Sequence, residues 1–153
     1  MRIVGLDVGL RRIGVAISDA TATLARPVGV LRPAGLAADA ARTTAAEIAR
    51  LRAEEDGVSA LVVGLPCHLD GSANDMTARV RVFAEELGRL TGLPVTLQDE
   101  RLTSREAESR LALRIKDWRD RKTRLDAAAA IILQDYLDIG AHRAGTVGQD
   151  AGS

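Results

Sequence analysis

The sequence predicts an α/β fold built on a five-stranded mixed sheet, with three antiparallel strands first, two parallel strands after them, and helices on the flanks. Two apolar runs, 3–8 and 13–17, flank a short Gly-Leu-Arg-Arg turn, which is the pattern of a β-hairpin. Two further apolar runs, 60–65 and 95–98, each follow a segment of helical character. Strands separated by helices pair in parallel through right-handed crossovers.

Local composition predicts the other elements of the first two thirds of the chain. Residues 23–31 are expected to form the third strand at an edge of the sheet, because Pro27 cannot donate a backbone hydrogen bond to a second neighbour. One helix is expected at 36–55, which is rich in Ala, Arg and Glu and has no internal Gly or Pro. Another is expected at 75–90, where apolar residues recur at helical spacing.

The last third of the chain is less regular. A third helix is expected after the Thr-Ser pair at 103–104, since either residue can cap a helix N-terminus. Segment 114–122 is highly charged and lacks periodicity, which predicts a mobile loop, and a final helix is expected at 125–137. We therefore expect one domain, residues 1–139, followed by a flexible C-terminal tail at 140–153.

Composition limits the class of protein. The chain has 153 residues, of which 46% are hydrophobic, and this suits one domain with a single core. No apolar run approaches the length of a membrane span, and the N-terminus lacks a signal-peptide pattern. Cys67 is the one cysteine, which excludes a disulfide within the chain and fits a reducing compartment. We expect a cytoplasmic protein without membrane association.

Asp7 lies near the end of the first expected strand, inside an apolar run. An ionised carboxylate in such a place is costly unless a positive group meets it. A metal ion, a metal-bound phosphate or a neighbouring arginine would meet that need, and capping of the turn is the ordinary alternative. The residues alone leave both interpretations open.

Further carboxylates follow later elements. Asp99 and Glu100 follow the fifth expected strand, and strand alternation sends them to opposite faces without choosing between them. Asp126 lies in the first turn of the last helix, on the stripe that faces the sheet; interaction with the helix N-terminus, Lys122 or Arg124 is its ordinary alternative. With the first strand's aspartate, these acids would repel one another unless a cation held them, and oxygen ligands suit Mg²⁺ or Mn²⁺. Two such ions could support phosphodiester hydrolysis.

The chain has no net charge, but its charges are unevenly distributed. Segment 101–124 holds nine Lys or Arg against four Asp or Glu, which is typical of a surface that binds a polyanion and equally of a solvated helix face. Arg101 and Lys122 in this segment are candidate phosphate contacts. Arg12, after the hairpin turn, is a third candidate for substrate binding, with an ion pair to a carboxylate as its alternative.

Four sequence blocks carry a resemblance to a known family. They are GLDVGLRRIGVAISD at 5–19, VVGLPCHLDGS at 62–72, DERLTSREAE at 99–108 and RLDAAAAIILQDYLD at 124–138. In this order they resemble the YqgF family, whose members are described as Holliday junction resolvases and as nucleases that mature the ends of pre-16S ribosomal RNA. The blocks and their intervals cover nearly the whole chain to Asp138. Leu10 and His68-Leu69 stand where the family often has Thr and Asn-Met.

This resemblance implies a ribonuclease H-like fold and a carboxylate metal site. Carried over to this chain, the site consists of Asp7, Glu100 and Asp126, which would be both the catalytic residues and the ligands of Mg²⁺ or Mn²⁺. Glu100 is favoured over Asp99 on this ground only. The implied function is metal-dependent endonucleolytic cleavage of structured RNA or branched DNA, with the end of pre-16S ribosomal RNA as the favoured substrate.

Three alternatives stay open beside this function. They are resolution of four-way DNA junctions, non-catalytic binding of nucleic acid, and phosphotransfer of the sugar-kinase kind. Carboxylates at all three positions argue against a pure binding module, because binding phosphates needs cations. Such kinases close two domains over ATP, and 153 residues hold only one. A pre-ribosomal particle is a candidate partner, and both a monomer and a homodimer are compatible with the sequence.

Overall fold

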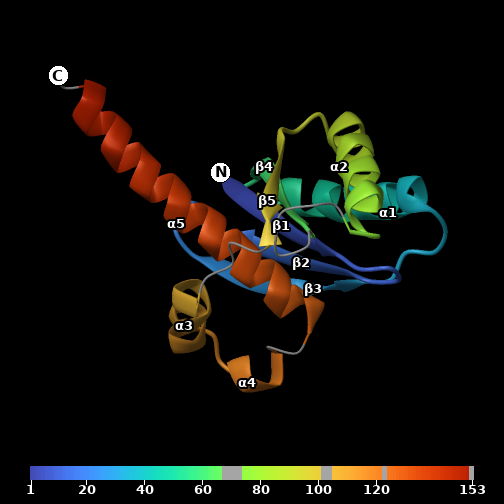
Figure 1. Cartoon of the computed structure of the whole chain (residues 1–153), viewed down its shortest axis with the longest axis horizontal. Helices are drawn as coiled ribbons and strands as arrows, with labels where there is room; N and C mark the ends of the chain where they lie inside the picture. The colour runs from blue at the N-terminus through green and yellow to red at the C-terminus, as the bar shows by residue number, and fades with distance from the viewer. Residues whose placement is uncertain (67–73, 101–104, 122–123, 152–153) are drawn as a thin grey trace.

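The computed structural model describes residues 1–66, 74–100, 105–121 and 124–151, with the backbone alone from residue 141. Its elements are β1 (Arg2–Val8), β2 (Ile13–Ser18), β3 (Ala25–Leu31), α1 (Ala37–Arg52), β4 (Val58–Leu65), α2 (Thr77–Thr91), β5 (Val95–Asp99), α3 (Arg105–Arg114), α4 (Trp118–Arg121) and α5 (Leu125–Ala151). The strands form one sheet in the order β3-β2-β1-β4-β5 (Figure 1). β1, β2 and β3 are antiparallel, whereas β4 pairs in parallel with both β1 and β5. The predicted five-stranded mixed sheet is confirmed.

Alternation along the strands sorts the side chains into two layers. On β1, Val4, Leu6 and Val8 join the core that lies under α1 and α2. Ile3 packs instead with the core of α5, α3 and α4. Figure 1 shows these helices on opposite sides of the sheet, with α5 crossing its full width. Asp7 shares the alternation of Ile3, so its side chain belongs to the α5 face.

β3 lies at an edge of the sheet, as Pro27 predicts. Val15 of β2 pairs with Gly29, but Ala16 pairs with Pro27, so Val28 has no partner residue opposite it. This β-bulge lies where the missing N–H of proline would otherwise interrupt the ladder. The other edge of the sheet is β5, next to β4.

The prediction of a mobile loop at 114–122 is wrong for its described part, because α4 forms there. Trp118 is only 7% exposed and packs in the core of α5 with Leu111. The carbonyl oxygen of Asp117 accepts hydrogen bonds from the backbone N–H groups of Asp120 and Arg121. Burial of Trp118 therefore stabilises the α4 turn, although the surrounding sequence is charged and shows no helical periodicity.

The end of the last helix at 137 is also wrong, because α5 continues to Ala151. The extension contains three glycines, which weaken a helix, but no proline, which would break it. Its C-terminal part extends beyond the sheet (Figure 1). The predicted division into a domain at 1–139 and a flexible tail at 140–153 stays a prediction. In the described part of the chain, no helix combines the length and apolarity that a membrane span requires.

Candidate active site

Asp7 lies near the carboxyl end of β1, the central strand of the sheet. It pairs across the hairpin with Gly14 of β2, and its side chain is half-buried on the α5 face. A Cβ atom at Gly14 would lie 2.0 Å from the carbonyl oxygen of Leu125 and 2.7 Å from the backbone nitrogen of Asp126. Glycine at this position therefore lets the N-terminus of α5 press directly against the strand beside Asp7.

Glu100 follows β5 and lies at the same end of the sheet, where the parallel strands finish. Because β1, β4 and β5 are parallel, their carboxyl ends meet there. Gly64 of β4 lies in between: a Cβ atom on it would be 2.7 Å from Glu100 Oε1 and 2.7 Å from Ile132 Cδ1. The Glu100 side chain therefore crosses the bare backbone of β4 toward β1. Strand alternation could not choose between Asp99 and Glu100, and the structure directs Glu100 to the α5 face.

Asp7 and Glu100 share a hydrogen bond between their carboxyl groups. Burial raises the pKa of Asp7, against a lowering by this hydrogen bond. Burial also raises the pKa of Glu100 to about 7, and the charge of Asp7 and the hydrogen bond add to that rise. Together with Ala128, Ile131 and Ile132 of α5, the pair lines a hollow of about 200 Å³. Two carboxyl groups so placed need a shared proton or a cation at neutral pH.

Asp126 lies in the first turn of α5 and is completely buried. Arg121 Nη1 donates a hydrogen bond of 3.0 Å to its Oδ2. Arg124 Nε lies 3.4 Å from Oδ1, and this oxygen accepts no hydrogen bond from a described group. The alternative in which Arg124 pairs with Asp126 is therefore realised, and Arg121 shares that role.

The structure thus brings two of the three predicted acids into one hollow and holds the third beside two arginines. Among the described residues, no group of three or more His, Cys, Asp or Glu is placed to hold a metal ion. The oxygen pair of Asp7 and Glu100 nevertheless fits the ligand preference of Mg²⁺ or Mn²⁺, since a divalent cation could take the place of the shared proton. Participation of Asp126 stays a prediction and requires it to give up its arginines.

The candidate substrate contacts are placed unequally. Arg12 is exposed and lines a hollow of about 350 Å³ with Arg32 and Arg124. Arg101 and Lys122 lie outside the described residues.

A buried polar pair behind Glu100 was missed by the sequence reasoning. Gln98 Nε2 donates a hydrogen bond of 3.4 Å to Asp135 Oδ2, and both residues are buried. Gln98 shares the alternation of Glu100, and Asp135 shares the helix face of Ala128 and Ile132 that lines the hollow. These two periodicities are the signals that could have found the pair.

Gln134 of α5 is a further polar residue that is fully buried. Its Oε1 accepts a hydrogen bond of 2.9 Å from the backbone nitrogen of Ala25, and its Nε2 donates one of 3.0 Å to the carbonyl oxygen of Thr23. Gln134 therefore fixes α5 to the start of β3.

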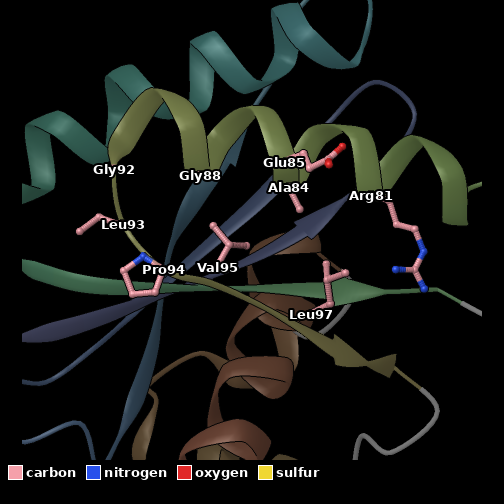
Figure 2. A pocket seen from close by; sticks show the side chains of 9 residues that line it. All are labelled: Arg81, Ala84, Glu85, Gly88, Gly92, Leu93, Pro94, Val95 and Leu97. Carbon is pink, nitrogen blue, oxygen red and sulfur yellow. The ribbon is translucent and has the colours of Figure 1, made fainter.

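A larger hollow, of about 780 Å³, lies between α2 and β5. Figure 2 shows Val95 and Leu97 under Ala84 of α2, with Arg81 at one end and Pro94 toward the other. Val95 and Leu97 pack against the core under α1 and α2, so this hollow opens on the face opposite Glu100. Its described lining holds no carboxyl pair, and size alone does not make it the reactive site.

Comparison with known proteins agrees with this architecture. The family model described as "RuvX: Holliday junction resolvase" matches residues 1–139. A protein of Anaeromyxobacter sp. (strain Fw109-5) named "Putative pre-16S rRNA nuclease" is 48% identical over 141 residues, which cover 90% of this chain and 97% of that protein. A protein of the same name from Chloroflexus aggregans (strain MD-66 / DSM 9485) is 44% identical over 137 residues, covering 89% of this chain and 92% of that protein.

The fold is also similar to a solved structure. The chain superposes on T. thermophilus RuvC, solved in complex with Holliday junction substrate, with a TM-score of 0.57 and 17% identity over 92% of this chain and 96% of that one. At this identity the likeness shows the fold alone, and it confirms the predicted ribonuclease H-like class. The match over residues 1–139 and the two relatives confirm the predicted resemblance: the chain belongs to the RuvX family.

Proposed function

We propose that this protein is a divalent-metal-dependent endonuclease that hydrolyses phosphodiester bonds at the end of pre-16S ribosomal RNA. The observation that carries the proposal is the hydrogen-bonded pair of Asp7 and Glu100 in one small hollow at the edge of the sheet. The relatives named for pre-16S rRNA support the choice of substrate. Since cleavage of any phosphodiester needs positive charge at the phosphate, a carboxyl pair makes chemical sense there only with a cation.

In this proposal Asp7 and Glu100 hold Mg²⁺ or Mn²⁺, with Asp126 as a third ligand. A bound divalent cation supplies the positive charge that the transition state of phosphodiester hydrolysis requires. Glu100 would release its proton to solvent on binding the cation, which a pKa of about 7 favours at neutral pH. Ile131 and Ile132 form an apolar wall that strengthens electrostatic interactions in the hollow.

Asp126 needs its own rearrangement in this account. Exchange of two arginines for one divalent cation would leave the charge balance around the buried Asp126 carboxylate unchanged. Arg121 and Arg124, once released, are positioned next to the site where the phosphates of the substrate would lie. Both arginines are partly exposed, so they can turn outward.

Resolution of four-way DNA junctions is the second candidate function. The description of the matching family and the likeness of the fold to the RuvC–junction complex favour it. Symmetric cutting of two strands would require two active sites, and hence a dimer. A binding module without catalysis is less compatible with the site, because a buried carboxyl pair repels a polyanion.

The test is a cleavage assay with fragments of pre-16S ribosomal RNA ends and with four-way DNA junctions, with and without Mn²⁺. We expect the wild type to cut the RNA fragments only with the metal, and Asp7→Asn to reduce cleavage by about 10²-fold or more. Asp56→Asn is the matched control, because Asp56 is exposed and precedes the amino end of β4, at the end of the sheet away from the site. Full cleavage by Asp7→Asn would refute the metal site, and preference for junctions would select the second candidate.

A further inference from the structure

A basic hollow lies at the same end of the sheet as the carboxyl pair, on the side of β3. Arg12 precedes β2 and Arg32 follows β3, and the pairing of Ile13 with Leu31 places these two arginines opposite each other. Arg124, immediately before α5, completes the hollow, which measures about 350 Å³. Val30 and Leu125 provide its apolar lining.

The charges of this hollow are not balanced by its own lining. None of the five described residues that line it is acidic. Arg12 and Arg32 are exposed, and neither side chain makes a hydrogen bond or ion pair with another described residue. Arg124 has one such partner, the Asp126 carboxylate at 3.4 Å. Guanidinium groups that converge without acids repel one another, and their planar donor forks match the oxygens of a phosphate.

The hollow is connected to the candidate active site through short structural links. Asp7 pairs with Gly14, whose Cα faces the backbone of Leu125 and Asp126. Adjacent strands lie about 4.8 Å apart, so β2 and β3 place Arg12 and Arg32 roughly 5 to 10 Å across the sheet edge from β1. That span corresponds to about one to three phosphates along one nucleic-acid strand.

We propose that Arg12, Arg32 and Arg124 form a phosphate clamp, which holds the backbone of the substrate strand on the β3 side of the scissile bond. This inference rests on the proposed function and extends it. The nucleic-acid strand would run across the ends of the β-strands, from Glu100 past Asp7 to Arg32. The clamp contacts backbone phosphates, so it contributes affinity without reading sequence. It differs from the basic segment 101–124 predicted from the sequence, because two of its three arginines come from the β2–β3 end of the sheet.

The clamp also accounts for the position of Arg124. This side chain lies between the buried Asp126 carboxylate and the open hollow. A phosphate in the hollow offers Arg124 a second anion and frees one oxygen of Asp126. Strand binding is therefore coupled through the Arg124 guanidinium group to the release of Asp126 Oδ1, while Arg121 holds Oδ2.

The test measures binding of a labelled fragment of the pre-16S rRNA end over a series of salt concentrations, in the Asp7→Asn background so that the probe stays intact. Arg32→Gln and Arg12→Gln should each lower the slope of log K against log salt by about 0.7, and the double substitution by about twice that. Arg26→Gln is the matched control, because Arg26 is exposed on the same strand β3 but does not line the hollow. It should leave the slope unchanged.

The clamp would be overturned if the salt slopes of Arg32→Gln and Arg12→Gln were the same as the slope of the control Arg26→Gln. Cleavage by the wild type separates this result from the proposed function. Binding that depends on the arginines without any metal-dependent cleavage would uphold the clamp and refute the nuclease. Metal-dependent cleavage, together with RNA binding that does not depend on the arginines, would support the nuclease and refute the clamp.

Discussion

Two carboxyl groups in a hollow of about 200 Å³ repel each other unless a positive charge or a proton lies between them. Asp7 and Glu100 meet this need with a shared hydrogen bond and raised pKa values. Asp126 meets the same need differently, since Arg121 and Arg124 neutralise its buried carboxylate. At the scale of single residues, the negative charges of the site are offset by a shared proton and by two arginines. In the proposed function a divalent cation takes over this role.

The raised pKa of Glu100 predicts how the stability of the metal-free protein depends on pH. Glu100 has a pKa of about 7 in the folded chain, against 4.5 as its ordinary value. The folded state therefore binds more protons between these pH values, so stability from this group is full below 4.5 and is lost as pH rises through about 7. Glu100→Gln, which is neutral throughout, should flatten the fall of the melting temperature over this range, as measured by circular dichroism.

Glu85→Gln is the control for this experiment, because Glu85 is exposed on α2 at the opposite face. It should keep the wild-type dependence on pH. A Glu100→Gln curve parallel to that of the wild type would show that Glu100 holds no extra proton in the folded chain.

At the scale of elements, α5 determines the site because it lies directly on bare strand backbone. A Cβ atom at Gly14 would meet the carbonyl oxygen of Leu125 at 2.0 Å, and one at Gly64 would meet two side-chain ends at 2.7 Å. Backbone cannot move without shifting the helix, whereas the ends of Glu100 and Ile132 can turn aside. The two glycines therefore serve different purposes: Gly14 is needed for docking of the helix, and Gly64 for the position of Glu100.

Alanine substitutions should separate these purposes. Gly64→Ala should displace Glu100 and lower metal-dependent cleavage by about tenfold or more, with a loss of about 1–3 kcal/mol in the free energy of unfolding. Gly14→Ala should cost more than about 3 kcal/mol, because the clash is with backbone. Urea unfolding and the RNA cleavage assay measure the two effects.

Gly140→Ala is the control, since a Cβ atom there meets nothing within 4 Å. It lies in a helix, where alanine in place of glycine should stabilise the fold by about 0.5–1 kcal/mol. Wild-type cleavage by Gly64→Ala, or wild-type stability of Gly14→Ala, would contradict the roles given to these glycines.

At the scale of the whole molecule, the sheet was predictable from the sequence because its signals are local. Alternation, the hairpin turn and Pro27 each act within a few residues, and together they predict the antiparallel β1, β2 and β3 and the place of β3 at an edge. α4 was not predictable in this way, because its turn depends on Trp118 finding a core built from distant parts of the chain.

The candidate site shows the same division. Placement of Asp7 near a strand end followed from its position in the sequence, and family resemblance favoured Glu100. Pairing of Asp126 with Arg121 could not be foreseen, because it depends on how α4 closes against the start of α5. Gln98 and Asp135 also meet only after the sheet and α5 have packed together.

Titration with Mn²⁺ by isothermal calorimetry measures whether Asp7 and Glu100 hold a divalent cation, as we propose. We expect the wild type to bind Mn²⁺ at pH 7 with release of protons, which two buffers of different ionisation enthalpy would reveal. Asp7→Asn and Glu100→Gln should each weaken binding by about tenfold or more, whereas Asp56→Asn should bind as the wild type does. Wild-type affinity for Mn²⁺ in both Asp7→Asn and Glu100→Gln would show that these two carboxyl groups do not hold the cation.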